Sequence, residues 1–460
     1  MTGSASKRRF NPYATGAVSI LAAVAAGTLL LMAPFSRADC RWGDFSDSLF
    51  TAFSAVCVTG LSVIDVGSEL SRCGLAIMTA LVEIGGLGYM TFGTLLLVAV
   101  GRKLSMSDES TALTAYGSED VRGVKSLLVR TFLITAAVQS AGIVTLWSRL
   151  AEAPPYSARA LCDASAWGKA VFYTAMAWSN AGFGLEPDSL RFAAHDPVIY
   201  HTCGILGTVG GLGFLVVYSL ATFRRGARGR KPHARLSLHV KLALSVSFTL
   251  LAAGTVLFAV LEWNHSLAGF GAADKISLSL FHAATPRTIG LSVLGVEDMT
   301  PATVLLNDVL MFCGASPGST GGGVKTTTIA VLVCTLIAMC RGRDETVIFK
   351  RQINNEIVRE SIVIFFLYAA VVFLATGILL VTESPGPGSF GRYLFEAVSA
   401  VSTTGLSIGD TTASLSQAGR VAIMACMLFG RLGALSIVFM IGRGQKHSRI
   451  RYPAEELIVG

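Results

Sequence analysis

Four short segments of the sequence end near a glycine and could turn consecutive backbone carbonyls toward an ion. They read SLFTAFSAVCVTGLS (48–62), AVFYTAMAWSNAGFG (170–184), SLFHAATPRTIGLS (279–292) and YLFEAVSAVSTTGLS (393–407). In each, a phenylalanine precedes the glycine by nine or ten residues, and Leu or Phe follows the glycine at once. Glycine adopts positive φ without steric cost, so it can direct carbonyl oxygens toward one axis. A ring of such oxygens can replace the hydration shell of a cation without adding net charge.

The segments therefore predict a cation-selective filter, to which each contributes its glycine and the two preceding residues. The predicted filter residues are Val58, Thr59, Gly60, Asn180, Ala181, Gly182, Thr288, Ile289, Gly290, Thr403, Thr404 and Gly405. The apolar half-helix before each glycine would point its partially negative C-terminal end at the pore centre. One such glycine alone would more often be a turn or a helix contact. Four in register favour the filter.

The spacing of the segments indicates a fourfold internal repeat, because the glycines lie 122, 108 and 115 residues apart. Three repeats also carry a matching tetrad, GGLG (85–88), GGLG (210–213) or GRLG (430–433). The third has GASPGSTGGGVKTTT (314–328) instead, which is too rich in glycine to continue a helix. The predicted units are 1–16 (tail), 17–101, 102–222, 223–340 and 341–442 (repeats with their linkers) and 443–460 (tail). Irregular backbone at membrane depth is tolerated where it lines a water-filled path, so the third repeat should contribute a gate.

The composition predicts a membrane protein, since 52% of the 460 residues are hydrophobic and only 14% are charged. Several stretches reach the length of about 20 apolar residues that a spanning helix needs. Five of them are Ala17–Phe35, Leu127–Trp147, Leu236–Leu261, Ile362–Val381 and Val421–Ile441. The first lacks the cleavage pattern of a signal peptide and is expected to stay in the mature protein. We expect an all-α membrane protein of four tandem helix–pore-loop–helix repeats around a central pore, with eight spanning helices and four re-entrant pore helices.

The formal net charge of +8 raises the alternative of a nucleic-acid-binding protein. The Lys and Arg residues, however, gather in both tails and in segments 102–130, 224–241 and 341–359, between apolar stretches. The positive-inside rule then places both termini and these linkers in the cytoplasm. The basic clusters are topology signals, and nucleic acid is not expected as a partner.

The predicted gate combines the glycine-rich loop with two basic residues that lie in apolar stretches. It comprises Gly318, Ser319, Thr320, Gly321, Gly322, Gly323, Lys325 and Arg431. A guanidinium inside a spanning helix is costly and usually faces an interior or aqueous cavity, so Arg431 should face the pore below the filter. Pairing with a buried carboxylate such as Glu83, or snorkelling to the interface, are the alternatives. A Walker phosphate loop is disfavoured because Val324 separates the glycines from Lys325.

Other chemistry is weakly represented. The histidines, including His195, His201 and His282, show no metal-ligand spacing, and no catalytic constellation emerges. A disulfide among Cys40, Cys73, Cys162 and Cys203 is conceivable if these lie near outer helix ends. An organic-solute carrier would be expected to show inverted repeats, whereas these run in parallel. Neither an enzyme nor a tightly bound cofactor is expected.

These motifs resemble the Trk/Ktr/HKT superfamily of potassium transporters, most of all its KtrB and TrkH membrane subunits. CVTGL, SNAGF, RTIGL and STTGL are similar to the family's four filter segments, and FGRLGALSI is similar to the segment that carries its pore arginine. The likeness covers nearly the whole chain. It implies one pore per subunit, a homodimer, the interrupted third repeat as intramembrane gate, and a nucleotide-binding cytosolic ring of KtrA or TrkA type.

The resemblance also implies an ion and a location. Four filter glycines accompany preference for K⁺ over Na⁺ in this family, and the expected location is the bacterial inner membrane. Sodium is then a stimulator or a weakly permeating ion, and the sequence does not distinguish the two. Pro286 and Ile289 depart from the family pattern, which leaves the detailed selectivity of the third segment open. Chain length and the ending RYPAEELIVG favour KtrB over TrkH.

Overall fold

The computed structural model describes residues 12–86, 124–152, 165–228, 236–383, 386 and 388–434. Each repeat contains a first helix, a short helix and a second helix. The first helices are α1 (Pro12–Met32), α7 (Val124–Glu152), α11 (Leu238–Glu262) and α15 (Asn355–Thr382). The short helices, here called pore helices, are α2 (Phe45–Cys57), α8 (Ala166–Ser179), α12 (Ala272–Ala284) and α16 (Ser389–Ser402). The second helices are α4 (Arg72–Gly86), α9 (Pro197–Leu212), α13 (Pro301–Phe312) and α17 (Gln417–Leu432). The predicted all-α fold of helix–pore-loop–helix repeats is confirmed.

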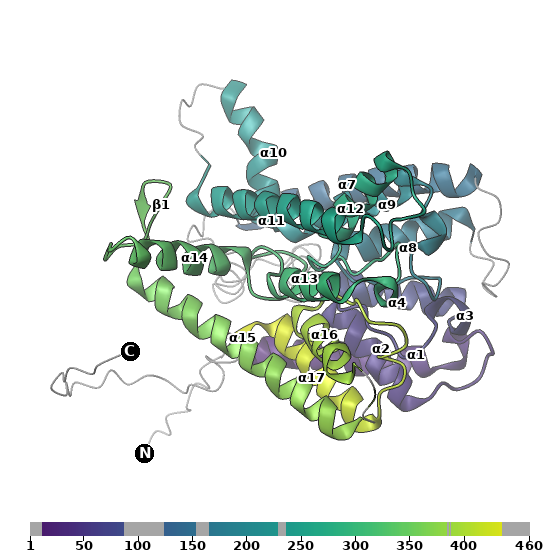
Figure 1. Cartoon of the computed structure of the whole chain (residues 1–460). Helices are drawn as coiled ribbons and strands as arrows, with labels where there is room; N and C mark the ends of the chain where they lie inside the picture. The colour runs from purple at the N-terminus through teal and green to yellow at the C-terminus, as the bar shows by residue number, and fades with distance from the viewer. Residues whose placement is uncertain are drawn as a thin grey trace, which may run out of the picture.

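Smaller elements complete the described chain. They are η1 (Pro34–Ser36), α3 (Val66–Glu69), η2 (Arg191–Ala193), α10 (Phe214–Arg228), η3 (Val296–Asp298), α14 (Thr326–Cys340), and the antiparallel strands β1 (Val347–Ile348) and β2 (Arg351–Gln352). Helix α10 stands out from the bundle at the top of Figure 1. The β1–β2 hairpin lies beside α14 at one end of the bundle (Figure 1).

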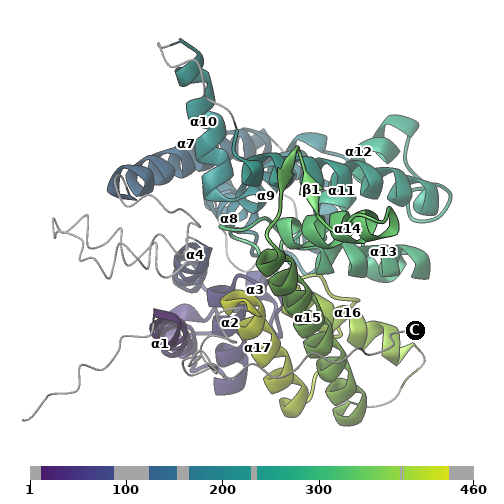
Figure 2. The ribbon, with the colours of Figure 1, turned by 90° about the vertical axis from the view of Figure 1, so that its left-hand side faces the viewer.

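The four repeats form a closed ring. Within each repeat, the first helix packs against the pore helix. Between repeats, the second helix packs against a pore helix of a neighbouring repeat, as α4 does against α8 and α17 against α2. The second and third repeats meet through α9 and α12, and the third and fourth through α13 and α16. Figure 2 shows the helices of the four repeats, coloured from purple to yellow, arranged around a common centre.

Polar contacts tie the last repeat to the first. Arg420 on α17 donates from Nη1 to Oδ1 of Asp47 on α2 at 2.7 Å. One turn away, the Ser46 hydroxyl donates to Oε1 of Gln417, also at 2.7 Å. Both pairs join residues more than 370 positions apart. The ring is therefore closed by side-chain bonds as well as by helix packing.

The interiors of the four repeats share one packing feature. The aromatic residues that mark the repeats, Phe50, Phe172, Phe281 and Phe395, are all buried on the pore helices. They belong to one continuous apolar cluster that includes residues of every repeat. The aromatic in each repeat is therefore a packing anchor that holds the pore helix in place.

The second helices of the last three repeats end or break where glycines follow. As predicted, the third repeat is interrupted, with α13 ending at Phe312 and α14 beginning at Thr326. The second repeat is interrupted as well, since α9 and α10 meet at 99° around Gly213, which has φ 92°. The stretch Val421–Ile441, predicted to be long enough for a spanning helix, is broken after α17, which ends at Leu432 with Gly433 at φ 80°; residues 435–441 lie outside the described residues. The last glycine of the tetrad ends each of these two helices because it readily adopts positive φ.

Three described helices are long and apolar enough to cross a bilayer, namely Val129–Ala151, Leu238–Glu262 and Asn355–Thr382, and the bent α9–α10 pair could form a fourth span. Their outer faces carry exposed large apolar side chains such as Phe248 and Phe373. Exposed apolar side chains of this size are expected on a lipid-facing helix. The count of eight spans stays a prediction.

Candidate functional site

The four predicted filter segments share one backbone conformation. In each, the glycine and the residue two positions before it both have positive φ. The values are Val58 56° and Gly60 96°, Asn180 58° and Gly182 69°, Thr288 71° and Gly290 76°, and Thr403 51° and Gly405 91°. Positive φ at a β-branched residue costs about 1–2 kcal/mol. The predicted filter segments are thus a place where backbone strain is held by the surrounding packing.

Three pore helices pass into their filter segments through the same terminating motif. At the end of α2, the Val58 N–H donates to the Ala55 carbonyl at 3.1 Å, and the Thr59 N–H to the Ser54 carbonyl at 2.8 Å. Helices α8 and α16 end in the same way, with Asn180 and Thr403 in the left-handed conformation. This pattern is a Schellman cap, which usually places glycine where these helices place Val, Asn and Thr.

The third segment reaches the same conformation by another route. Helix α12 ends at Ala284, before Pro286, which has no N–H to donate. The Arg287 side chain turns outward and donates to the Ser247 carbonyl and hydroxyl on α11, at 3.1 and 3.0 Å. The Ile289 side chain packs against Gly207 of α9. The unusual residues of this segment thus bond and pack toward neighbouring helices.

The four glycines lie side by side in a tight ring. A Cβ added to Gly60 would lie 2.8 Å from the Cα of Gly182, and one added to Gly405 would lie 2.9 Å from the Cα of Gly60. A Cβ on Gly290 would likewise lie 2.8 Å from the Cα of Gly182. Carbonyl oxygens of Thr59, Ala181 and Thr404 are among the nearest atoms. Only glycine fits at these positions, and backbone oxygens converge there.

One face of the ring opens into a vestibule of about 670 Å³, lined by all four glycines. Its charged lining consists of five carboxylates against one arginine, namely Asp65, Glu186, Asp188, Glu297, Asp410 and Arg191. Sequence analysis did not single out these acids. Their signal is that each lies four to seven residues after a filter glycine. The excess of negative charge concentrates cations in front of the ring.

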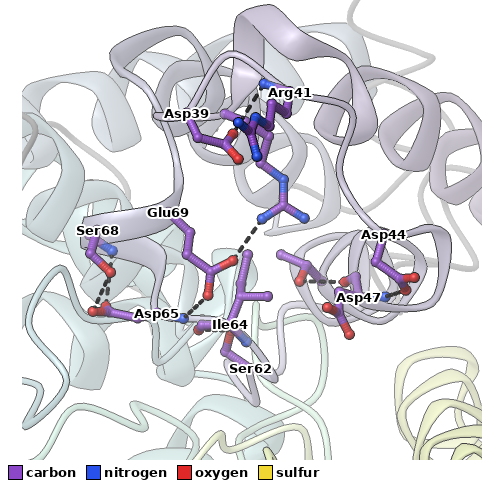
Figure 3. A network of polar contacts seen from close by, with 12 residues as sticks. Asp39, Arg41, Asp44, Asp47, Ser62, Ile64, Asp65, Ser68 and Glu69 are labelled. Atoms are coloured by element: carbon purple, nitrogen blue, oxygen red, sulfur yellow. Dashed lines mark hydrogen bonds and ion pairs between the residues drawn. The ribbon is translucent and has the colours of Figure 1, made fainter.

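A polar network at the edge of the vestibule fixes one of its walls. Glu69 accepts from Nη1 of Arg37 at 2.8 Å. Glu69 also accepts from the Asp65 N–H at 3.2 Å, and Asp65 caps the short helix α3 (Figure 3). The Ser68 hydroxyl donates to Asp65 at 2.5 Å. Both oxygens of Asp65 therefore have partners that hold this carboxylate at the rim.

The opposite face of the ring is covered by the glycine-rich loop between α13 and α14. The Gly322 N–H donates to the Thr403 hydroxyl at 3.0 Å, and a Cβ on Gly321 would lie 2.8 Å from the Thr288 Cβ. The second repeat also contacts the loop, through a bond of 2.9 Å from the Phe214 N–H to the Gly318 carbonyl. The predicted gate residues are therefore in direct contact with the third and fourth filter segments.

Two positive side chains bind this loop. Nζ of Lys325 donates to the Gly321 carbonyl at 2.6 Å, and Nη1 of Arg431 donates to the carbonyl of Thr320. Nη2 of Arg431 donates to the carbonyl of Gly85 on α4, so this guanidinium links the loop, α17 and the first repeat. Glu83, considered as an alternative partner, accepts from Gln139 of α7 at 2.8 Å.

The remaining predicted positions have ordinary surroundings. Within the described residues, no group of three His, Cys, Asp or Glu side chains could hold a metal ion. Cys40, Cys73 and Cys203 are free thiols, and Cys162 lies outside the described residues. His201 shares a bond of 2.7 Å with the Ser277 hydroxyl, and His195 contacts the ring of Phe270.

Comparison with known proteins identifies the family of this chain. The profile of a family described as "TrkH: Cation transport protein" matches residues 17–444. The chain belongs to the TrkH family of cation transport proteins. As a member of this family it is a membrane-embedded transporter and not an enzyme.

Individual TrkH-family proteins resemble the chain over its whole length. The "Ktr system potassium uptake protein B" of Bacillus subtilis is 34% identical over 454 residues, covering 98% of this chain and 97% of the relative. The "Potassium/sodium uptake protein NtpJ" of Enterococcus hirae is 30% identical over 462 residues, covering 99% and 98%. The crystal structure of the potassium transporter TrkH from Vibrio parahaemolyticus has the same fold, with a TM-score of 0.72, 17% identity, and coverage of 96% of this chain and 87% of TrkH.

Proposed function

We propose that this TrkH-family chain takes up K⁺ across the bacterial inner membrane, through a filter made of carbonyl oxygens from its four repeats. The observation that carries this proposal is the ring of four glycines with converging backbone oxygens. Carbonyl rings suit monovalent cations, because they replace hydration without a fixed charge that would hold the ion too tightly. Relatives named for potassium uptake, with 30–34% identity over nearly the whole chain, support K⁺ as the ion.

The glycine-rich loop is the gate in this proposal. It lies against the filter on the side opposite the vestibule, where a permeating ion must pass. Lys325 and Arg431 hold its carbonyls and place two positive charges near the path, which opposes passage of a cation. Transport then requires that the loop leave the filter and that these bonds break.

The proposal also covers the assembly. The chain works as a homodimer with both termini in the cytoplasm, and a nucleotide-binding ring of KtrA or TrkA type controls the loop. The word "system" in the names of the Ktr relatives supports a partner subunit. No cofactor is tightly bound; K⁺ is the cargo, and Na⁺ is either an activator or a weakly permeating ion.

The test is rescue of a bacterium that lacks its own potassium importers. Growth and rubidium uptake are measured at micromolar to millimolar K⁺, with the chain expressed alone and together with a ring subunit. We expect rescue that is stronger with the ring subunit. A chain that reaches the membrane yet gives no uptake under either condition would refute K⁺ transport.

Neutralising the vestibule should slow capture of the ion. In the triple variant Asp188→Asn, Glu297→Gln, Asp410→Asn, we expect a several-fold higher apparent KM for Rb⁺ at low ionic strength, because electrostatic focusing is lost. The difference should shrink at high salt, where charges beyond about 8 Å are screened. The matched control is Asp39→Asn, which changes an acid outside this vestibule. It should leave both the apparent KM for Rb⁺ and its salt dependence at the wild-type level.

A further inference from the structure

The residue that follows the marker phenylalanine on each pore helix occupies an equivalent place behind the filter. The four residues are Thr51, Tyr173, His282 and Glu396. All four are buried, although their side chains have little in common. Three of them accept hydrogen bonds from the segment that follows the filter glycine, which forms the wall of the vestibule.

Tyr173 holds the second segment. Its hydroxyl accepts from the Leu185 N–H at 3.2 Å, three residues after Gly182. The side chain is 1% exposed, and its ring packs edge-on against Phe172 with centroids 5.8 Å apart. Removing the phenolic oxygen would take this acceptor away from the buried Leu185 N–H, which is energetically costly.

His282 holds the third segment in the same manner. Nε2 accepts from the Leu294 N–H at 3.2 Å, which assigns the ring proton to Nδ1 when the imidazole is neutral. The imidazole is stacked on Phe258 of α11, with centroids 5.0 Å apart and an interplanar angle of 10°. Both the ring orientation and the bonded nitrogen are thereby fixed.

Glu396 holds the fourth segment with both carboxylate oxygens. Oε2 accepts from the Ser407 hydroxyl at 2.8 Å, two residues after Gly405, and Oε1 accepts from the Thr412 hydroxyl. The side chain is completely buried. Thr51 in the first repeat differs, because its hydroxyl donates to the Asp47 carbonyl of its own helix.

We propose that Tyr173, His282 and Glu396 are positioning residues that set the K⁺ over Na⁺ preference by holding the outer end of three filter segments. This inference rests on the proposed function. The pore helix fixes the inner end of each segment through its terminal backbone bonds, and these side chains fix the outer end. Each filter segment is then held at both ends, which limits how far its carbonyls can move inward to coordinate a smaller ion.

The test compares variants that each remove the side-chain acceptor of one segment. Tyr173→Phe removes a single oxygen and keeps the packed ring, and Glu396→Leu removes both acceptors of the fourth segment. We expect the Na⁺ to Rb⁺ uptake ratio to rise about tenfold in Glu396→Leu and by a smaller factor in Tyr173→Phe, as lost buried hydrogen bonds would give. Glu396→Gln keeps one carbonyl acceptor and should restore most of the preference.

Thr51→Val is the matched control, since it changes the equivalent residue of the repeat that lacks this bond in the structure, and its ratio should stay at the wild-type value. Thr412→Val tests the same contact from the other side and leaves the pore helix intact. If well-expressed Tyr173→Phe, Glu396→Leu and Thr412→Val all keep the wild-type ratio, the inference is wrong. A wild-type chain that does not transport K⁺ would instead refute the proposed function.

Discussion

Gly290→Ala should raise the apparent KM for Rb⁺ by about 100-fold and weaken discrimination against Na⁺. A Cβ at this position would lie 2.8 Å from the Cα of Gly182 and closer still to the Thr404 carbonyl oxygen, in a backbone with φ 76°. Left-handed strain of about 1–2 kcal/mol and overpacking of about 1–3 kcal/mol together correspond to roughly two orders of magnitude. Uptake kinetics at matched membrane protein levels measure the effect.

The matched control is Gly377→Ala on α15, where an added Cβ would meet nothing within 4 Å. This substitution should leave transport unchanged and slightly favour the helix. Wild-type kinetics in Gly290→Ala would mean that the ring is not the site of ion selection.

Arg431→Gln should increase the maximal uptake rate several-fold and reduce its dependence on the ring subunit. The substitution removes a positive charge and the bridge from α17 to the carbonyls of Thr320 and Gly85. The loop is then held to the filter by fewer bonds, and the population with the loop displaced should rise. Shortening the loop within Gly321–Gly323 should act in the same direction. Both are measured as initial rates of rubidium uptake.

Arg431→Lys separates the two contributions, since it keeps the charge while a single ammonium is poorly suited to bridging two distant carbonyls. A rate near wild type in Arg431→Lys would assign the barrier to charge, and a rate near that of Arg431→Gln would assign it to the bridge. An unchanged rate and an unchanged protein level in Arg431→Gln would contradict a role in gating.

The ring of four glycines could be predicted from the sequence because it depends on one residue type in a repeated place. Gly60 and its three counterparts recur with the same aromatic spacing, and the structure places them together. The interrupted third repeat was likewise visible as a run of glycines. In both cases backbone conformation matters more than side-chain chemistry, and glycine marks it directly.

Other features depended on contacts that a single sequence does not contain. The sequence did not reveal that the helix bends at Gly213, because a glycine there could equally have served close helix packing, as the preceding glycines do. Tyr173, His282 and Glu396 share no chemical type, and only the structure reveals that they bond to equivalent segments. The partners of Arg431 are backbone carbonyls from two other repeats, which no sequence pattern indicates.

The closure of the ring by Arg420 and Asp47 has an evolutionary consequence. In a symmetric homotetramer every substitution would appear at four places around the axis, so a change tolerated at one place would have to be tolerated at all. A single chain that closes on itself is free of this constraint. Pro286 can therefore occupy the third predicted filter segment alone, and the third repeat can carry the glycine-rich loop 314–328 while the other three keep their tetrads.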